Sequence, residues 1–370
     1  MNNPPETAYI GVYSSLMNSF TFSGKPKEVA VGLGQRNLYA IEGIMKGHYK
    51  NILCVLSDSH RQDDTVAQAV HIAKAHQASL TIMLALEALP PNASMVMESF
   101  SYIDSQQTME TQAKHWLSEQ AESWGKQYAL DTTVSVGQPL IDVVSYVLKN
   151  DIDLVIKRAE ESFLDKLFGS LDMRLFRKCP CPVWIINHKP RSQYKNVVAA
   201  LDLNYHYPQH EVSIRRDLNR DILRHASQIA LLEFAQLHIV HVFDAVPENI
   251  ARDGFITVDN DRMETDLAKI HAEREAELES LLEELNQELD DSVVEYLNPQ
   301  KHIVHGYPRR EIAATTTSLD TDIIVMGTVA RLGVPGFIMG DTAEETIQQL
   351  QCAVVGIKPR GFETPISFKK

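Results

Sequence analysis

The sequence predicts an α/β protein with two tandem doubly wound parallel-sheet domains packed as a pseudo-dimer. Short apolar runs alternate with amphipathic helical patterns, and strands of this kind are buried on both faces of a parallel sheet. The chain also repeats itself. Tyr49-Lys50-Asn51 recurs as Tyr194-Lys195-Asn196, an offset of 145 residues (194 − 49), and an apolar run follows each occurrence. Two copies in one chain favour a pseudo-two-fold pair joined through the final strands.

The later parts of the two copies repeat at a larger offset. Asp153-Leu-Val-Ile recurs as Asp322-Ile-Ile-Val, an offset of 169 (322 − 153), and Cys181-Pro-Val-Trp matches Cys352-Ala-Val-Val at 171 (352 − 181). The growth from 145 places one long insertion in the middle of the second copy. The repeat therefore predicts domain 1 over residues 49–190, domain 2 over 194–360 and a C-terminal tail over 361–370.

Residues 1–48 lie outside both copies and show no sustained hydrophobic period. They lack the basic start and apolar core of a secretory signal. We interpret them as a poorly ordered N-terminal extension, which is common at chain ends. A translation start at Met45 and a small structured cap are the alternatives.

The first copy predicts the order β-α-β-α-β-α-β-α-β. Apolar runs place strands at Asn51–Leu56, Leu80–Leu86, Thr132–Val136, Leu154–Lys157 and Val183–Asn187. Helical periodicity places helices at Asp64–Gln77, Thr108–Tyr128, Leu140–Lys149 and Leu171–Lys178. Trp116 and Trp124 share one face of the second helix, which is typical of core packing rather than of a ligand platform.

The second copy predicts the same course. Strands are expected at Val197–Asp202, Gln236–Phe243, Val293–Tyr296 with His302–Val304, Ile323–Gly327 and Val354–Lys358. Helices are expected at Asp217–Glu233, Asp261–Asp290, Arg310–Ser318 and Thr342–Leu350. The long second helix has a leucine face and a glutamate face, which indicates a solvated amphipathic helix. A partner-binding groove on that helix is the alternative.

Composition limits the partners and the compartment. Lys+Arg 35 against Asp+Glu 49 gives a net charge of −14, a field that repels nucleic acid and anionic membranes. No apolar run is long enough to span a bilayer. The four cysteines fit a reducing cytoplasm. Cys179 and Cys181 could form a redox or metal pair, but their spacing is wrong for a zinc loop, and we expect them to pack as small hydrophobes.

The candidate site lies in the second copy, where ligands bind beyond the carboxyl ends of parallel strands. Asp202 ends the first strand of that copy and Gly327 ends the fourth. The run from Gly327 through Arg331 to Gly340 then opens a helix at Asp341 and Thr342, the layout that brings backbone N–H groups to a phosphate.

These residues resemble the universal stress protein family. The resemblance rests on Asp202 and on the glycine loop, and it extends from Tyr49 to about Pro359. The runs Arg177-Lys-Cys-Pro-Cys-Pro-Val-Trp184 and Gly340-Asp-Thr-Ala-Glu344 are similar to the E-type tandem members of Gram-negative bacteria. The family implies a Rossmann-like fold of the adenine-nucleotide alpha-hydrolase type. In its ATP-binding members, the aspartate holds base and ribose and the glycine loop holds the phosphates.

The match to the ATP-binding pattern is incomplete in both halves. In the second half, Ala330 replaces a glycine and Asp341 replaces a hydroxyl with a negative charge, although Thr342 and Arg331 could compensate. In the first half, Arg158 and Glu161 occupy the glycine positions, Ser57 corresponds to Asp202, and Gly169-Ser170 survives opposite Gly340-Asp341. The first half is therefore expected to be structural, without a phosphate-sized cavity. The second half is expected to have an open cleft.

We therefore expect a non-enzymatic, cytoplasmic stress-response protein that acts through a small ligand, such as ATP, AMP or another molecule, or through protein partners. An ATP-binding or weakly ATP-hydrolysing switch is the alternative, and a homodimer is open. The sequence has no G-x-S-x-G, H-E-x-x-H or complete Walker motif, so no catalytic residue is assigned. No metal site is assigned either. His206 and His210 are expected in an exposed loop, and His238 and His241 on opposite sides of one strand.

Overall fold

The computed structural model describes residues 49–57, 63–89, 102–126, 128–160, 168–187, 193–204, 207–244, 260–289, 291–328 and 339–366. The predicted N-terminal extension lies outside these residues. No helix among the described segments is both long enough and apolar enough to cross a membrane.

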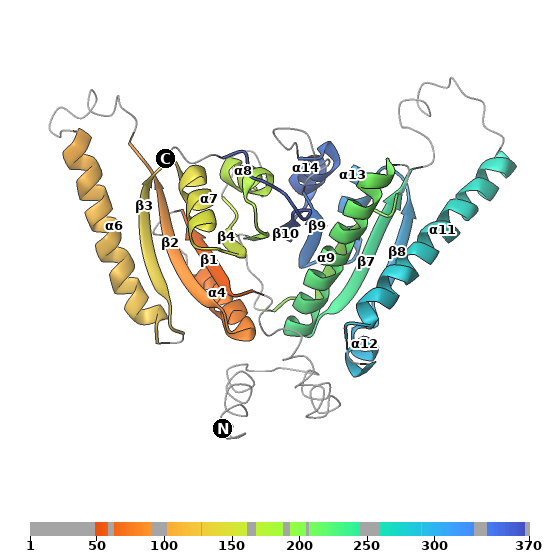
Figure 1. Ribbon diagram of the computed structural model, residues 1–370, viewed down its shortest axis with the longest axis horizontal. Helices are drawn as coiled ribbons and strands as arrows, with labels where there is room; N and C mark the ends of the chain where they lie inside the picture. The colour runs from red at the N-terminus through yellow and green to blue at the C-terminus, as the bar shows by residue number, and fades with distance from the viewer. Residues whose placement is uncertain are drawn as a thin grey trace.

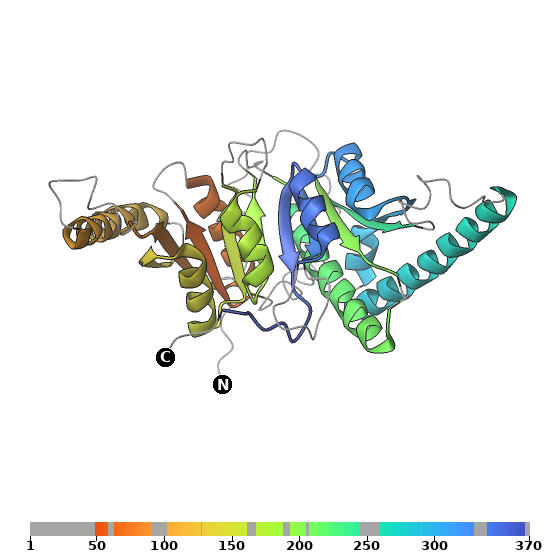
Figure 2. The same cartoon turned by 90° about the horizontal axis from the view of Figure 1, so that it is seen from above.

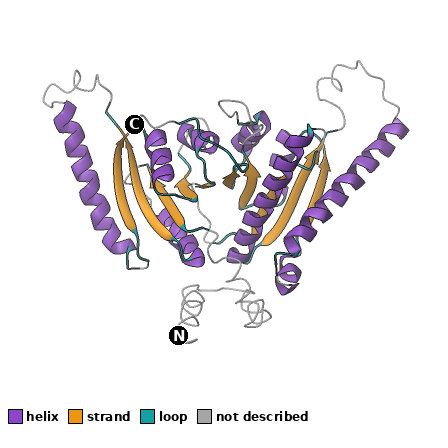
Figure 3. Ribbon diagram, in the orientation of Figure 1, coloured by secondary structure: helices purple, strands orange, loops and turns teal. Residues whose placement is uncertain are grey.

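A ten-stranded sheet forms the centre of the molecule, in the order β3-β2-β1-β4-β5-β10-β9-β6-β7-β8 (Figure 1, Figure 3). The first half contributes β1 (Asn51–Leu56), β2 (Ser79–Glu87), β3 (Asp131–Gly137), β4 (Leu154–Arg158) and β5 (Val183–Ile186). The second half contributes β6 (Asn196–Leu201), β7 (Gln236–Phe243), β8 (Gln300–His305), β9 (Ile323–Gly327) and β10 (Ala353–Ile357). Strands are parallel within each half, as the continuous apolar runs predict.

Helices cover both faces of the sheet. Their bounds are α4 (Asp63–His76), α6 (Tyr102–Trp124), α7 (Pro139–Lys149), α8 (Ser170–Lys178), α9 (Gln209–Glu233), α11 (Asn260–Asn286), α12 (Asp291–Leu297), α13 (Pro308–Ser318) and α14 (Asp341–Gln349). One core cluster contains side chains of α4, α6, α9, α11 and α12, and the other contains those of α7, α8 and α14. Each cluster runs through both halves, so the halves share their core. Seen from above, α6 and α11 lie at the two ends of the molecule (Figure 2).

The halves meet at β5 and β10, which confirms the predicted contact through the final strands. The pairing is antiparallel, with Val355 opposite Trp184. The two expected sheets are therefore one continuous sheet. Gly356 is required at this joint because a Cβ there would lie 2.6 Å from Phe176 and 2.7 Å from Thr328.

Two predicted elements differ most from the structure. The helix expected at Thr108–Tyr128 is also displaced, since α6 runs from Tyr102 to Trp124. Val293–Tyr296 is not a strand but lies in α12, where Val293 and Leu297 stand one helical turn apart and are both buried. Its β-branched run has the local pattern of a strand, but burial of one helical face stabilises a helix there instead. The helix expected from Asp217 starts eight residues earlier, at Gln209, because Pro208 at the N-cap begins it. The polar residues of its first two turns carry little hydrophobic signal.

Candidate functional site

The candidate site residues that the structure describes lie at the carboxyl end of the second half's strands. β6 and β9 are neighbours, with Ala200 opposite Met326, so Asp202 and Gly327 follow adjacent strand ends. Gly340 is the N-cap of α14, and the exposed Asp341 and Thr342 form its first turn. Arg331 and Ala330 lie outside the described residues. The cleft expected between these residues therefore stays a prediction.

Asp202 is held by side chains that follow it in the chain. Its Oδ2 accepts a hydrogen bond from Arg215 Nη1 at 2.7 Å. Its Oδ1 accepts bonds from the backbone and side-chain nitrogens of Asn204, at 3.2 and 3.0 Å. The side chains of Asp202 and Arg215 remain 39% and 18% exposed. The Asp202 carboxylate is thus paired within the chain, yet it still reaches solvent.

Arg215 is itself held in place from α9. Its guanidinium carbon lies 3.5 Å from the centre of the Tyr207 ring, a cation–π contact. Its Nη2 lies 3.7 Å from Glu211 one turn away. Burial, and secondarily the Asp202 charge, raises the pKa of Tyr207, so its phenol stays protonated at neutral pH. Sequence reasoning missed Arg215, which precedes Asp217, the predicted start of this helix.

The backbone at Asp202 is fixed by a buried amide. Asn219 accepts the Asp202 N–H at 3.1 Å and donates to the Asp202 carbonyl at 2.8 Å, so one side chain satisfies both backbone groups. His241 Nδ1 lies 3.1 Å from the Leu201 carbonyl oxygen. Burial lowers the pKa of His241, which keeps it neutral. The end of β6 is therefore held by hydrogen bonds with side chains of α9 and β7.

Gly327 allows α9 to approach β9 closely. A Cβ at this position would lie 2.9 Å from Leu218 Cδ2. The next residue, Thr328, is fully buried, and its Oγ1 accepts a hydrogen bond from Lys358 Nζ at 2.6 Å. The start of the glycine loop is thus tied to the end of β10.

The equivalent place in the first half holds a buried ion pair. Lys157 Nζ lies 2.8 Å from Asp172 Oδ1, and the two residues are 1% and 0% exposed. Asp172 Oδ2 accepts the backbone N–H groups of Glu160 and Gly169, each at 2.9 Å. Asp172 is the third residue of α8, and its carboxylate bonds back to the N–H of the N-cap residue, Gly169, as in a capping box.

A second carboxylate closes the N-terminus of α8. Glu160 Oε2 accepts the Leu171 N–H at 3.1 Å, and Glu160 Oε1 lies 3.7 Å from Lys157 Nζ. A helix N-terminus attracts anions. Here the chain's own carboxylate occupies it. A Cβ on Gly169 would lie 2.1 Å from Glu160 Oε2, so that glycine makes room for the carboxylate.

The second half lacks this ion pair. By the repeat offsets, Lys157 corresponds to Met326 and Asp172 to Ala343. Met326 and Ala343 are 4% and 8% exposed and belong to one apolar cluster. One strand end is therefore filled by paired charges and the other by apolar packing.

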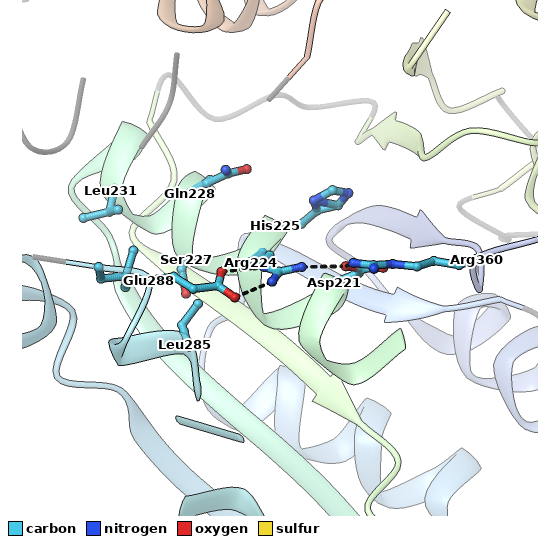
Figure 4. A pocket seen from close by; sticks show the side chains of 10 residues that line it. Asp221, Arg224, His225, Ser227, Gln228, Leu231, Leu285, Glu288 and Arg360 are labelled. Atoms are coloured by element: carbon cyan, nitrogen blue, oxygen red, sulfur yellow. Dashed lines mark hydrogen bonds and ion pairs between the residues drawn. The ribbon is translucent and has the colours of Figure 1, made fainter. Parts of the chain in front are cut away.

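A cavity of about 420 Å³ lies away from both strand ends, between α9, the end of α11 and Arg360 (Figure 4). Arg224 pairs with Asp221 at 3.1 Å and with Glu288 at 2.8 Å. Arg360 pairs with Asp221 at 2.8 Å. These charges compensate one another, and Leu231, Leu285 and Leu289 supply the apolar wall. The leucine face of α11 thus packs mainly into the core, as Leu278 and Leu281 are fully buried.

The strand histidines are arranged partly as predicted. His238 and His241 do not form a pair. Instead, His238 Nδ1 lies 3.1 Å from His302 Nε2 on the neighbouring strand β8. Burial lowers the pKa of both rings of this pair. Within the described segments, no three His, Cys, Asp or Glu side chains are placed to share a metal ion. His206 and the side chain of His210 lie outside the described residues.

Comparison with known proteins gives a consistent family match. The model described as the universal stress protein family matches residues 48–187 and 216–358. Universal stress protein E of Photorhabdus laumondii subsp. laumondii is 26% identical over 87% of this chain and 99% of its own length. Universal stress protein E of Escherichia coli K12 is 24% identical, over 86% and 97%. A solved, functionally unknown protein of Pseudomonas aeruginosa PAO1 shares the fold, with 21% identity, a TM-score of 0.56 and coverage of 86% and 95%.

Proposed function

Because this chain belongs to the universal stress protein family and carries two tandem copies of its domain, we propose that it is a non-enzymatic stress-response protein of the cytoplasm. It acts by binding a small polar ligand at the strand ends of its second half, with protein partners responding to the bound state. The second family match, residues 216–358, covers the glycine loop on which the resemblance was partly based, whereas Asp202 lies between the two matches. The similarity to E-type tandem relatives extends over most of the chain.

The observation that carries the ligand proposal is the Asp202–Arg215 pair. It offers a carboxylate acceptor and a guanidinium donor side by side, and both side chains reach solvent. A ligand with a hydroxyl or amine donor beside a carbonyl or phosphate acceptor would match this pair. A ribose next to a phosphate has that chemistry.

The charge on α14 limits the kind of phosphate ligand. Asp341 stands in the first turn of α14, where a phosphate would otherwise approach the helix N-terminus. Two unit charges about 4 Å apart repel by about 4 kcal/mol at an effective dielectric near 20. A nucleoside or a monophosphate such as AMP therefore fits the proposal better than ATP.

Mass spectrometry of small molecules released from the native protein tests the proposal, followed by calorimetric titration with adenosine, AMP and ATP. We expect one of the less charged compounds to bind, and Asp202→Ala to weaken that binding by at least about tenfold. The matched control is Ser57→Ala, the equivalent position of the first half, which should leave affinity unchanged. Equal affinity in wild type and in a folded Asp202→Ala protein would contradict the proposed site.

An ATP-binding or weakly ATP-hydrolysing switch is the second candidate, favoured by retention of Gly327 and Gly340. The variant Ala330→Gly with Asp341→Ser removes one methyl group and one negative charge. If these two residues weaken ATP binding, the variant should bind ATP about a hundredfold more tightly than wild type. Tight binding and steady phosphate release by the wild type would instead support the second candidate.

A further inference from the structure

Two cysteines face each other where α8 ends and β5 begins. The Sγ atoms of Cys179 and Cys181 lie 3.6 Å apart, and both residues are free cysteines. They are 0% and 8% exposed. Cys179 is the C-cap of α8, and its N–H donates to the Leu175 carbonyl at 2.9 Å. The second half has Leu350 and Cys352 at the equivalent positions, so it lacks a second thiol there.

A buried lysine of the second half joins this cluster. Lys358 Nζ donates to the Phe176 carbonyl of α8 and to Thr328 Oγ1. Burial lowers the pKa of Lys358 to about 8, while the charges of the two cysteines act in the opposite direction. Lys358 therefore links the cysteine pair of one half to the residue after Gly327 in the other.

The two thiols differ in character. The pKa of Cys179 is lowered, first by the hydrogen bond from Cys181 and also by the charge of Lys358. Burial, followed by the contact with Cys179, raises the pKa of Cys181. Two thiols in contact, one with a lowered and one with a raised pKa, are the arrangement of an attacking cysteine with its resolving partner.

We propose that Cys179 and Cys181 form a reversible intramolecular disulfide on reaction with a hydroperoxide, and that Lys358 transmits this change to Thr328. In the first step, the Cys179 thiolate attacks a peroxide oxygen and the O–O bond breaks, which leaves a sulfenic acid after protonation. The Cys181 thiol then attacks that sulfur, forming the S–S bond and releasing water. Overall, the two thiols lose two hydrogens and the hydroperoxide is reduced to an alcohol, or to water when it is hydrogen peroxide. A dithiol reductant reverses the reaction.

The geometry supports both parts of the proposal. The sulfurs are already in contact, 3.6 Å apart, which is about 1.5 Å longer than an S–S bond. Cys179 ends α8, and Lys358 donates both to the Phe176 carbonyl of that helix and to Thr328 Oγ1. A change at the cysteine pair therefore reaches the start of the glycine loop through these two hydrogen bonds. Disulfide formation itself does not depend on the proposed ligand function.

Treatment of the full-length protein with hydrogen peroxide, followed by denaturation, alkylation and intact mass measurement, tests the disulfide. The chain has four cysteines. We expect four alkylated thiols before oxidation and two after it, and peptide mapping should find the link between Cys179 and Cys181. Dithiothreitol should restore all four. Cys54→Ser is the matched control, a buried cysteine outside the pair. It should give three alkylated thiols before oxidation and one after it, with the same link between Cys179 and Cys181.

Two further measurements test the roles of the individual groups. Lys358→Met should slow disulfide formation by about tenfold, since loss of its positive charge raises the pKa of Cys179 and so reduces the thiolate fraction. Amide hydrogen exchange at Thr328 should become faster on oxidation of the wild type but not of Cys181→Ala. Four reactive thiols after peroxide, or a disulfide that involves Cys352, would overturn the redox pair. Unchanged exchange at Thr328 in a fully oxidised protein would overturn the link through Lys358.

Discussion

The ends of β4 and β9 are equivalent places in the two halves, and they are filled by opposite chemistry. At β4, Lys157 and Asp172 form a buried pair 2.8 Å apart, and Glu160 occupies the start of α8. At β9, Met326 and Ala343 take the places of that pair. The same backbone therefore supports a charged cluster of Lys157, Asp172 and Glu160 in one half and apolar packing of Met326 and Ala343 in the other.

The difference shows how a nucleotide-type strand end can be closed without a change of fold. The helix N-terminus and its backbone N–H groups are still present at α8, but carboxylates of the chain already satisfy them. A phosphate would have to displace Glu160 and approach Asp172, and like charges repel. In the second half the positions of Lys157 and Asp172 carry no charge, so the negative charge near a ligand comes from Asp341 and Glu344 in the first turn of α14.

The largest expected effect on stability comes from removing one partner of the Lys157–Asp172 pair. Asp172→Ala leaves Lys157 buried without its partner and should lower the free energy of unfolding by about 3–5 kcal/mol. The double variant Lys157→Met with Asp172→Ala copies the second half and should recover most of that loss. Urea denaturation measures both. A double variant as unstable as the single one would show that the pair is not what distinguishes the two ends.

A smaller effect on stability is expected from a substitution that crowds the Glu160 side chain. Gly169→Ala should cost about 2–3 kcal/mol, since its Cβ would lie 2.1 Å from Glu160 Oε2 and 2.4 Å from Glu160 Cβ. The backbone itself is not strained, as φ of Gly169 is −78°. The cost should shrink when Glu160→Gly removes the clashing side chain. Thermal unfolding of the four proteins in this double-mutant cycle gives the coupling energy, and additive effects would contradict the clash.

A glycine-to-alanine substitution at the end of β9 in the second half should be milder. Gly327→Ala would place a Cβ 2.9 Å from the tip of the Leu218 side chain, which can rotate away. We expect a loss of about 1 kcal/mol in urea denaturation. Shortening the neighbour, as in Leu218→Ala, should abolish the extra cost of the alanine at 327. A loss larger than that of Gly169→Ala would reverse the order expected from the two contacts.

The smallest effect concerns the outer strands and depends on pH. Burial lowers the pKa of His238 and His302 below the ordinary 6.5. The unfolded chain then binds more protons than the folded one, so stability falls as pH drops through 6.5. By strand register, the first half has Thr81 and Thr133 at these places. In His302→Thr, the free energy of unfolding should therefore fall less between pH 6.5 and 5 than it does in the wild type. Urea denaturation at each pH measures this. An unchanged slope would argue against the pair.

Much of the fold could be predicted because parallel strands buried on both faces give continuous apolar runs. β1, β7 and β9 occur at their predicted residues. The internal repeat and the bare final strands predicted how the halves join, and the family matches confirm the resemblance. The exception is α12, whose short β-branched run has the local pattern of a strand. There only the contact with the rest of the fold selects a helix.

The candidate site was less predictable than the fold. Asp202, Gly327 and Gly340 stand out because a turn or a close approach restricts the residue type. Arg215 and Asn219 do not, since nothing local to a polar helix shows that two of its side chains face a strand end. The charged cluster of Lys157, Glu160 and Asp172 was also not predicted from the sequence. Lys157 and Glu160 were noted only as non-glycine residues, and their contact with Asp172 depends on how α8 packs back onto β4.

The antiparallel joint of β5 and β10 has a consequence for how the two ends could diverge. In a homodimer, every substitution appears twice, so a change that closes one site closes both. Here the same assembly is made by a single chain, and each half can vary independently while the shared core keeps them together. The Lys157–Asp172 pair, the cysteine pair and the histidine pair each occur in only one half. The protein is in effect a heterodimer whose subunits cannot be exchanged or separated.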